Sequence, residues 1–238
     1  MPVKMLNFNG IIIEAEVKNV RSLSIRVRRD GSVRLSIPFG TPPEEGHRFV
    51  VEHEDWIRKH SDASKQKQEA LKSLTAHDFH EGERFRVFEK DYPLHCIPAP
   101  RAKGCRLADG QFILECPPDL PTAKKLALVN KFYSTLFREA IDRLLAVWLP
   151  RMEEDRHPVT YSLFLARSRW GTCKPALRHI RLNMHLLFYP RECLELIVVH
   201  ELCHLKEASH NASFHALMQT YLPDYKTRDK ILKNHLLA

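Results

Sequence analysis

Residues 198–210, with the sequence VVHELCHLKEASH, place three histidines and a glutamate within thirteen positions. Because an α-helix turns about 100° per residue, His200 and His204 lie on the same helical face. Both imidazoles can then reach one metal ion, and Glu201 lies beside them within reach of a water on that ion. The apolar run LELIVV before the motif suits a buried helix that holds these side chains rigidly. The stretch therefore restricts the chain to folds in which a buried helix carries a metal-binding face.

The third ligand depends on where this helix ends. A helix that simply continued would place His210 about 80° away from the face of His200. His210 joins the other two histidines only if the helix ends near Glu207 and the chain turns back. Ser209 or Asn211 can cap the helix that follows such a turn. If the helix runs on, Glu207 lies on the ligand face instead, so we favour His210 as the third ligand and keep Glu207 as its rival.

Three protein ligands and an open fourth position are typical of a catalytic zinc site. Zinc lowers the pKa of bound water to near 7, and Glu201 can take that proton and pass it to a leaving group. The pattern predicts hydrolysis with one divalent ion per chain. Zinc is preferred, although nickel, cobalt or manganese fit such a site according to supply. A metal-free helix of hydrogen-bonded core histidines is the alternative.

The chain of 238 residues is long enough for one large domain or two small ones. No apolar run approaches the ~20 residues that cross a bilayer. The Ile run near the N-terminus ends at Glu14, too early for a signal-peptide core. Six cysteines are scattered without a C-x-x-C pair, which favours buried thiols over a disulfide framework. We therefore expect a cytoplasmic protein with no membrane partner, while its oligomeric state is not indicated.

Hydrophobic periodicity predicts an α+β fold. Residues 10–38 alternate between apolar and polar, with Asp30-Gly31 as a hairpin turn and arginines on the exposed face. A helical arm is predicted over about 43–78, and residues 83–116 return to strand-like runs. A long helix over 124–148 leads to a further strand and then to the motif helix. We expect a β-rich N-terminal region over 1–119, with the helical arm as an insertion, and a metallohydrolase domain over 120–238.

Several segments together resemble the YgjP-like metal-dependent hydrolases, zincin-type proteins related in motif to the SprT and WLM metalloproteases. The segments are SRWGTCK (168–174), IRLNMHL (180–186), VVHELCHL (198–205), His210 followed by Phe214, RSLSIRVRRDGSVRLSIP (21–38) and WIRKH (56–60). The resemblance implies His200, His204 and His210 as metal ligands and Glu201 as the catalytic acid and base. It also implies a zincin-like, peptidase-type second half with an edge strand, preceded by a β-rich part.

The sequence departs from the family pattern at two places. Many relatives have a short glycine turn after the SRWGTCK segment, where this chain has PALRH, and position 215 is often Trp where this chain has His. The first difference leaves the shape of that loop open, and neither affects the ligands.

A zincin binds a peptide by main-chain pairing along an edge strand beside the metal helix. Residues 179–186, HIRLNMHL, are our candidate for that strand, where Asn183 either bonds the substrate or braces the site.

The charge near the motif favours a different substrate. No Asp or Glu occurs from Arg156 to Arg191, but seven basic residues do, and five of them lie between 167 and 181. Guanidinium groups bind phosphate well, so the segment is suited to a phosphate-bearing small molecule. A solvated basic face is the plainer interpretation. The candidate substrate-binding residues are Arg167, Arg169, Lys174, Arg181 and Asn183.

Three hypotheses follow. The first is a zinc-dependent hydrolase of metallopeptidase type, and the second is a metal-dependent phosphohydrolase acting on nucleoside triphosphates. The third, a nucleic-acid-associated binding module, is the weakest. A module without catalysis has no need of Glu201, and no aromatic and basic platform for single strands is evident.

Overall fold

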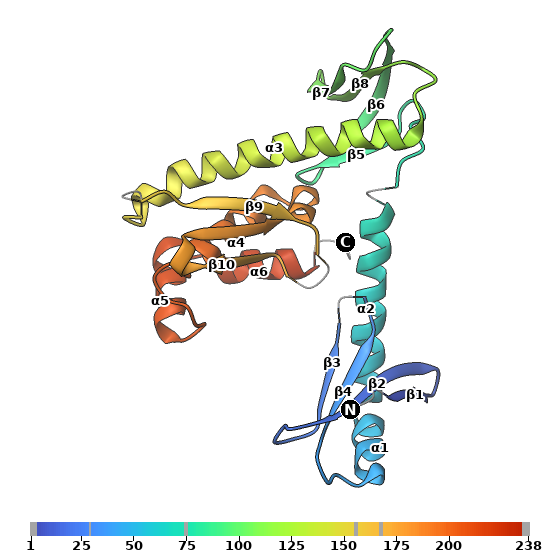
Figure 1. The fold of residues 1–238 in the computed structure, drawn as a ribbon, viewed down its shortest axis with the longest axis vertical. Coiled ribbons are helices and arrows are strands. Elements are labelled where there is room, and N and C mark those ends of the chain that lie inside the picture. The colour runs from blue at the N-terminus through green and yellow to red at the C-terminus, as the bar shows by residue number, and fades with distance from the viewer. Residues whose placement is uncertain (1–3, 29, 74–75, 155–156, 167–168, 235–238) are drawn as a thin grey trace. The chain divides into compact units, whose positions relative to one another are not determined.

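A computed structural model describes residues 4–28, 30–73, 76–154, 157–166 and 169–234 of the chain. They form two compact units, unit 1 within Met1–Ser73 and unit 2 within Leu74–Leu236. Three mixed sheets and six α-helices in the described residues confirm the predicted α+β class (Figure 1). The predicted domain boundary after residue 119 falls inside unit 2 and stays a prediction.

Unit 1 contains a four-stranded sheet in the order β1-β2-β4-β3. Its strands are β1 Lys4–Phe8, β2 Ile11–Lys18, β3 Ser24–Val27 and β4 Val33–Pro38. Strands β2 and β4 run parallel, while β3 and β4 pair antiparallel and confirm the predicted hairpin. Gly31 in their connection has a φ of 80°, a conformation that favours glycine.

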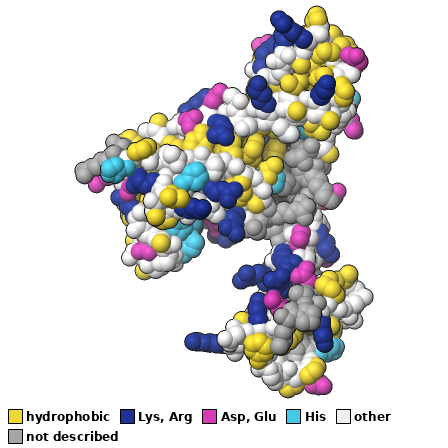
Figure 2. Space-filling model, viewed as in Figure 1, with side chains coloured by type: hydrophobic (Ala, Val, Ile, Leu, Met, Phe, Trp, Pro, Cys, Tyr) yellow, Lys and Arg dark blue, Asp and Glu magenta, His cyan; other side chains and the backbone are white. Residues whose placement is uncertain are grey.

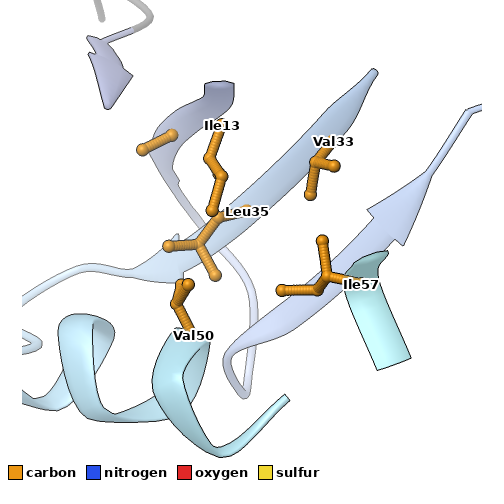
Figure 3. Packing of buried hydrophobic residues seen from close by; sticks show 6 residues of the cluster. Ile13, Val33, Leu35, Val50 and Ile57 are labelled. Carbon is orange, nitrogen blue, oxygen red and sulfur yellow. The ribbon is translucent and has the colours of Figure 1, made fainter. Parts of the chain in front are cut away.

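Two helices cover one face of this sheet, α1 Pro43–Glu52 and α2 Glu54–Ser73. Proline and two glutamates in the first turn of α1 favour a helix start there. Apolar side chains from the inner face of the sheet meet those of the helices in one buried cluster, which includes Ile13, Val33, Leu35, Val50 and Ile57 (Figure 3). This core gives unit 1 a hydrophobic interior of its own.

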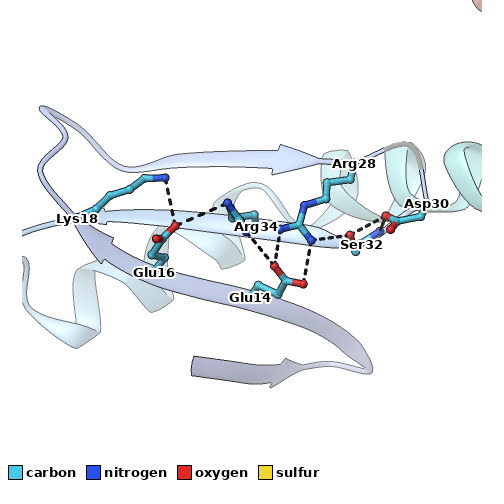
Figure 4. A network of polar contacts seen from close by, with 7 residues as sticks. All are labelled: Glu14, Glu16, Lys18, Arg28, Asp30, Ser32 and Arg34. Atoms are coloured by element: carbon cyan, nitrogen blue, oxygen red, sulfur yellow. Dashed lines mark hydrogen bonds and ion pairs between the residues drawn. The ribbon is translucent and has the colours of Figure 1, made fainter. Parts of the chain in front are cut away.

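The other face of the sheet carries charged side chains, as the alternation predicts. Arg28 donates from Nη1 to Oε1 of Glu14 over 2.9 Å, and Arg34 lies 3.5 Å from the same carboxylate (Figure 4). The hydrogen bonds from Arg28 are the main reason that the pKa of Glu14 lies below its usual value. Arg28 and Arg34 are therefore paired with acids of strand β2.

Unit 2 begins with a second four-stranded sheet, in the order β5-β6-β8-β7. Its strands are β5 Arg84–Val87, β6 Lys90–Pro98, β7 Gly104–Ala108 and β8 Gln111–Cys116. Helix α3, Thr122–Arg151, packs on this sheet and contains the long helix predicted over 124–148. Aromatic rings join the two: Phe85 stacks on Phe112 at 4.4 Å, and Phe112 meets Tyr133 at 5.9 Å.

A three-stranded sheet in the order β10-β11-β9 lies next to the motif helix. The strands are β9 Thr160–Phe164, β10 Gly171–Lys174 and β11 His179–Asn183, followed by the short 3-10 helix η2, Met184–Phe188. The prediction that residues 179–186 supply the free edge is wrong. Strand β11 pairs with β10 on one side and with β9 on the other, so its main-chain groups are already used.

The segment PALRH forms the turn between β10 and β11, as the 3-10 helix η1, Pro175–Leu177, and Arg178. Arg178 has a φ of 44°, the left-handed conformation that a glycine adopts more readily. Its guanidinium bonds a carboxylate oxygen of Glu154 at 2.7 Å and the carbonyl oxygen of Glu154 at 2.8 Å. These bonds hold Arg178 in the left-handed conformation.

Three helices complete unit 2: α4 Arg191–Cys203, α5 Ala212–Tyr221 and α6 Tyr225–Asn234. Glu195 ties α4 to its neighbours, because it accepts from Nε1 of Trp148 on α3 at 3.0 Å and from Arg228 on α6 at 2.5 Å. The motif helix is thus fixed from two sides. Within the described residues, every helix is too short or too polar to cross a membrane.

Candidate metal centre

Helix α4 is buried along most of its length, which follows from its sequence. Pro190 precedes its first turn, and the apolar residues Leu194 and Leu196–Val199 are all buried. The helix ends at Cys203 with His204 as its capping residue, a few positions before the predicted end near Glu207. The ligand-bearing side chains therefore project from the last turn of a rigid, buried helix.

The chain turns back after α4, as predicted if His210 is to meet the other two histidines. The side chain of Asn211 caps α5 by accepting from the main-chain N–H of Phe214 at 3.0 Å. Asn211 was one of two candidates for this cap. The cap fixes the start of α5 at Ala212, two positions after His210.

The three histidines converge through their Nε2 atoms. Nε2 of His210 lies 3.0 Å from Nε2 of His200 and 3.1 Å from Nε2 of His204. Nitrogen ligands at the usual distance from a tetrahedral zinc ion are roughly 3.3 Å apart. Among the described residues, these three form the one cluster of histidine, cysteine or acidic side chains with metal-ligand spacing. The donor set and its spacing fit a single small ion.

The protonation of the cluster suits metal binding. Burial, together with the neighbouring His204 and His210, lowers the pKa of His200 to about 4. His204 is oriented by a second contact, because its Nδ1 lies 2.9 Å from the carbonyl oxygen of Glu207. Since that carbonyl can only accept, Nδ1 carries the proton and Nε2 presents its lone pair to the cluster.

Phe214 forms an apolar wall against the cluster. Its ring centroid lies 4.9, 4.6 and 4.8 Å from those of His200, His204 and His210, and the side chain is 2% exposed. The sequence reasoning gave Phe214 no role of its own. The available signal was an apolar residue in the first turn of the helix that follows the ligand turn.

Glu207, the rival third ligand, lies apart from the three converging nitrogens. Its Oε1 accepts from the hydroxyl of Ser209 at 2.9 Å and from the main-chain N–H of Ser209 at 3.1 Å. Glu207 thus stabilises the ligand turn, with both its main chain and its side chain.

Glu201 is buried beside the cluster, with 4% of its surface exposed. Within the described part of the chain, no hydrogen bond or ion pair contacts its carboxylate, and burial raises its pKa to about 8. The strand β10 passes directly over it: a Cβ added to Gly171 would lie 2.4 Å from Oε1 of Glu201. Burial and the nearby Glu201 raise the pKa of Cys173 on the same strand to about 11, so this thiol stays protonated.

The predicted substrate-binding residues differ in their surroundings. Asn183 is fully buried, and its amide donates to the carbonyl oxygens of Ala166 at 2.7 Å and Arg169 at 2.8 Å. It thereby holds the loop that leads into β10. Arg169 and Lys174 are exposed, and the described residues offer them no carboxylate partner. Arg167 lies outside the described residues.

Three other basic side chains of the acid-free segment have partners within the protein. The guanidinium of Arg181 lies over the ring of Phe164 at 4.9 Å, and that of Arg191 lies over Phe88 at 4.1 Å. Arg178 bonds Glu154, so an acid from outside the segment neutralises it. Figure 2 shows Lys and Arg side chains around histidines on the visible face of the part of unit 2 that holds β9 and β10. Only some of the basic side chains of the segment are therefore free for a ligand.

A comparison with protein families decides the identity. The family model described as YgjP-like, metallopeptidase domain, matches residues 21–235, which is most of the chain. The chain belongs to the YgjP-like metallopeptidase family. The resemblance drawn from the sequence motifs is thereby confirmed. As a YgjP-like protein the chain is a metal-dependent hydrolase, and membership in the family implies a divalent ion.

Two solved structures resemble parts of this YgjP-like chain. The metallopeptidase zymogen abylysin of Pyrococcus abyssi is 21% identical, covers 41% of this chain and 95% of its own, and gives a TM-score of 0.38. The zymogen jannalysin of Methanocaldococcus jannaschii is 16% identical, covers 42% of this chain and 95% of its own, and gives a TM-score of 0.34. A comparison with curated proteins gives no significant match.

Proposed function

We propose that this YgjP-like protein is a zinc-dependent peptidase whose ion is held by His200, His204 and His210. The observation that carries the proposal is the convergence of three Nε2 atoms at 3.0 and 3.1 Å beside a buried glutamate. Three neutral imidazoles favour zinc among the divalent ions, and other transition metals can bind the same donors according to supply.

Glu201 is proposed as the general base and general acid. When bound, the ion supplies a Lewis acid that lowers the pKa of a water and polarises a peptide carbonyl. Glu201 would take a proton from the attacking water and deliver it to the departing amine. Its burial and the absence of a competing partner among the described residues leave the carboxylate free for this transfer. A nearby cation would favour its charged form, as the base role requires.

The substrate is proposed to be a peptide that pairs with strand β10. This strand is at one edge of its sheet among the described residues, and it begins at Gly171, directly beside Glu201. A peptide added as a further strand along β10 would place its main chain beside the carboxylate. This assignment replaces residues 179–186, because residues 179–183 form the central strand β11 and residues 184–186 belong to η2.

Residues flanking this edge are proposed to contact the substrate. Arg169 precedes β10 and Lys174 ends it, and both are exposed. Arg167 lies outside the described residues and is kept as a candidate. Arg181 and Asn183 are proposed to support the edge strand from the neighbouring strand β11. Arg181 already lies over Phe164, and Asn183 already bonds the main chain of the loop. The comparisons lend no support to the nucleotide phosphohydrolase or to the nucleic-acid module.

Metal content is the first test of this proposal. Elemental analysis of the purified chain should find close to one divalent ion per chain, with zinc bound in preference to other ions. His204→Ala should lose that ion, because it removes one of the three converging nitrogens. His80→Ala, at an exposed histidine of the same unit, is the matched control and should keep it.

Activity is the second test. The metallated protein, incubated with a library of unstructured peptides, should release fragments that chelation abolishes. Full metallation without cleavage of any peptide, or a wild-type chain that binds no divalent ion, would contradict the proposed function.

A further inference from the structure

The chain has a glycine at position 171 that its backbone conformation does not demand. Six glycines lie in the positive-φ region, where other residues are strained: Gly10, Gly31, Gly40, Gly82, Gly104 and Gly110. Gly171 is not among them and lies in a regular strand, paired with Leu182. Glycine weakens a strand and often marks a close approach of another group. The reason for glycine here must therefore come from its neighbours.

The neighbour is Glu201. A Cβ at position 171 would lie 2.4 Å from Oε1, 2.8 Å from Cγ and 2.9 Å from Cδ of Glu201. All three distances are shorter than van der Waals contact, and the three nearest atoms belong to this one side chain. The main chain of β10 thus closes over the carboxylate from one side, while Glu201 itself projects from the rigid, buried helix α4.

We propose that Gly171 is a positioning residue: its missing side chain creates the space in which Glu201 holds its carboxylate beside the histidine cluster. The inference rests on the proposed role of Glu201. A methyl group at position 171 would have to displace the carboxylate, because the helix backbone is fixed by packing on both sides. Misplacement of a catalytic group by about 1 Å can cost roughly 100-fold in rate.

Gly171→Ala in the full-length, zinc-loaded protein tests this inference. We expect kcat to fall about 100-fold, with KM within about threefold because the main chain of the edge strand is unchanged. Zinc stoichiometry should stay the same, because no histidine moves. Gly46→Ala is the matched control, since Gly46 has no positive φ. Apart from its chain neighbours and its own helix backbone, the nearest atom to an added Cβ is Cδ1 of Ile37, at 3.9 Å. A kcat for Gly171→Ala within twofold of the control would overturn the inference and leave the proposed function intact.

A second measurement is independent of activity and decides the inference even if no peptide is cleaved. The loss in unfolding midpoint caused by Gly171→Ala is measured in the wild-type background and in the Glu201→Ala background. We expect a clear loss in the first and almost none in the second, because the atoms that the methyl group meets are then absent. Equal losses in both backgrounds would overturn the inference, since the methyl group would then strain the strand itself.

A crystal structure of the zinc-loaded Gly171→Ala variant gives the direct readout. The carboxylate of Glu201 should be displaced from its wild-type position, with the three histidines unchanged. An unmoved carboxylate would also overturn the positioning role.

Discussion

At the scale of single residues, burial shifts the pKa values of two groups at the site, His200 and Glu201. Burial keeps His200 neutral, with a pKa of about 4, so its lone pair is available to a cation throughout the neutral range. Burial also raises the pKa of Glu201 to about 8, because the described residues give its charge no partner. A carboxyl group whose pKa lies close to neutral pH is suited to act first as the acceptor and then as the donor of a proton in one reaction cycle.

Glu201→Gln should abolish turnover while the metal stays bound. The amide has nearly the same shape but cannot take a proton, so kcat should fall by about 10² to 10⁴. Steady-state kinetics with elemental analysis of the same sample measures both quantities. Glu192→Gln, at an exposed glutamate in the first turn of the same helix, is the matched control. Turnover retained by the Glu201 variant would refute the acid and base role.

The stability of the metal-free protein should depend on pH through Glu201. Its folded pKa of about 8 lies above the ordinary value of 4.5. Between these values the folded state binds a proton that the unfolded state has lost, so stability falls as the pH rises. Relative to Glu201→Gln, the wild-type free energy of unfolding should fall by on the order of 1 kcal/mol per pH unit. Denaturant titrations at several pH values, with chelator present, measure this; a constant difference would contradict it.

At the scale of elements, one buried side-chain amide, that of Asn183, holds the loop before β10. Asn183 donates to the carbonyl oxygens of Ala166 and Arg169, and its Oδ1 accepts from the main-chain N–H of His185 at 3.1 Å. It therefore joins the loop before the edge strand to the start of η2. The position of β10 beside Glu201 depends on this support.

Asn183→Ala should lower the free energy of unfolding by about 2–4 kcal/mol. The substitution leaves two carbonyl groups and one N–H without their partner in a buried place, and such groups are costly. Chemical denaturation of the variant and the wild type measures the difference. Asn130→Ala, at an exposed position of α3, should change stability little. A loss equal to that of the control would show that the loop does not need the amide.

At the scale of the whole molecule, the described residues divide into two compact units, and only one of them carries the candidate metal site. The core around Ile13, Leu35 and Ile57 belongs to unit 1. The three converging histidines, Glu201 and the edge strand all belong to unit 2. The division predicts that metal binding and the stability of the first core can be changed separately.

Leu35→Ala should destabilise unit 1 by about 2–5 kcal/mol without changing metal stoichiometry. Leu35 is 1% exposed, so its loss leaves a cavity among the residues drawn in Figure 3. Denaturant unfolding followed by elemental analysis of the folded variant measures both effects. Leu177→Ala, at a leucine that is 67% exposed, is the control. Loss of the ion from the folded Leu35 variant would show that the site also depends on unit 1.

Much of this protein follows from local sequence patterns. The α+β class, the hairpin at Asp30-Gly31 and the long helix after residue 121 follow from periodicity and turn chemistry, which act over a few residues. The same holds for the shared face of His200 and His204, because a spacing of four residues fixes their relation within any helix. The family, too, could be recognised from short motifs and was then confirmed over residues 21–235.

The tertiary structure decided what depends on groups far apart in the chain. It placed His210 with the other histidines and Glu207 apart from them, because the cap at Asn211 ends the turn there. Among the described residues it put β10 at an edge of its sheet and residues 179–183 at the centre, since sheet order is set by pairing between distant segments. It also brought Gly171 against Glu201, thirty positions apart, a contact that no local pattern encodes because only packing creates it.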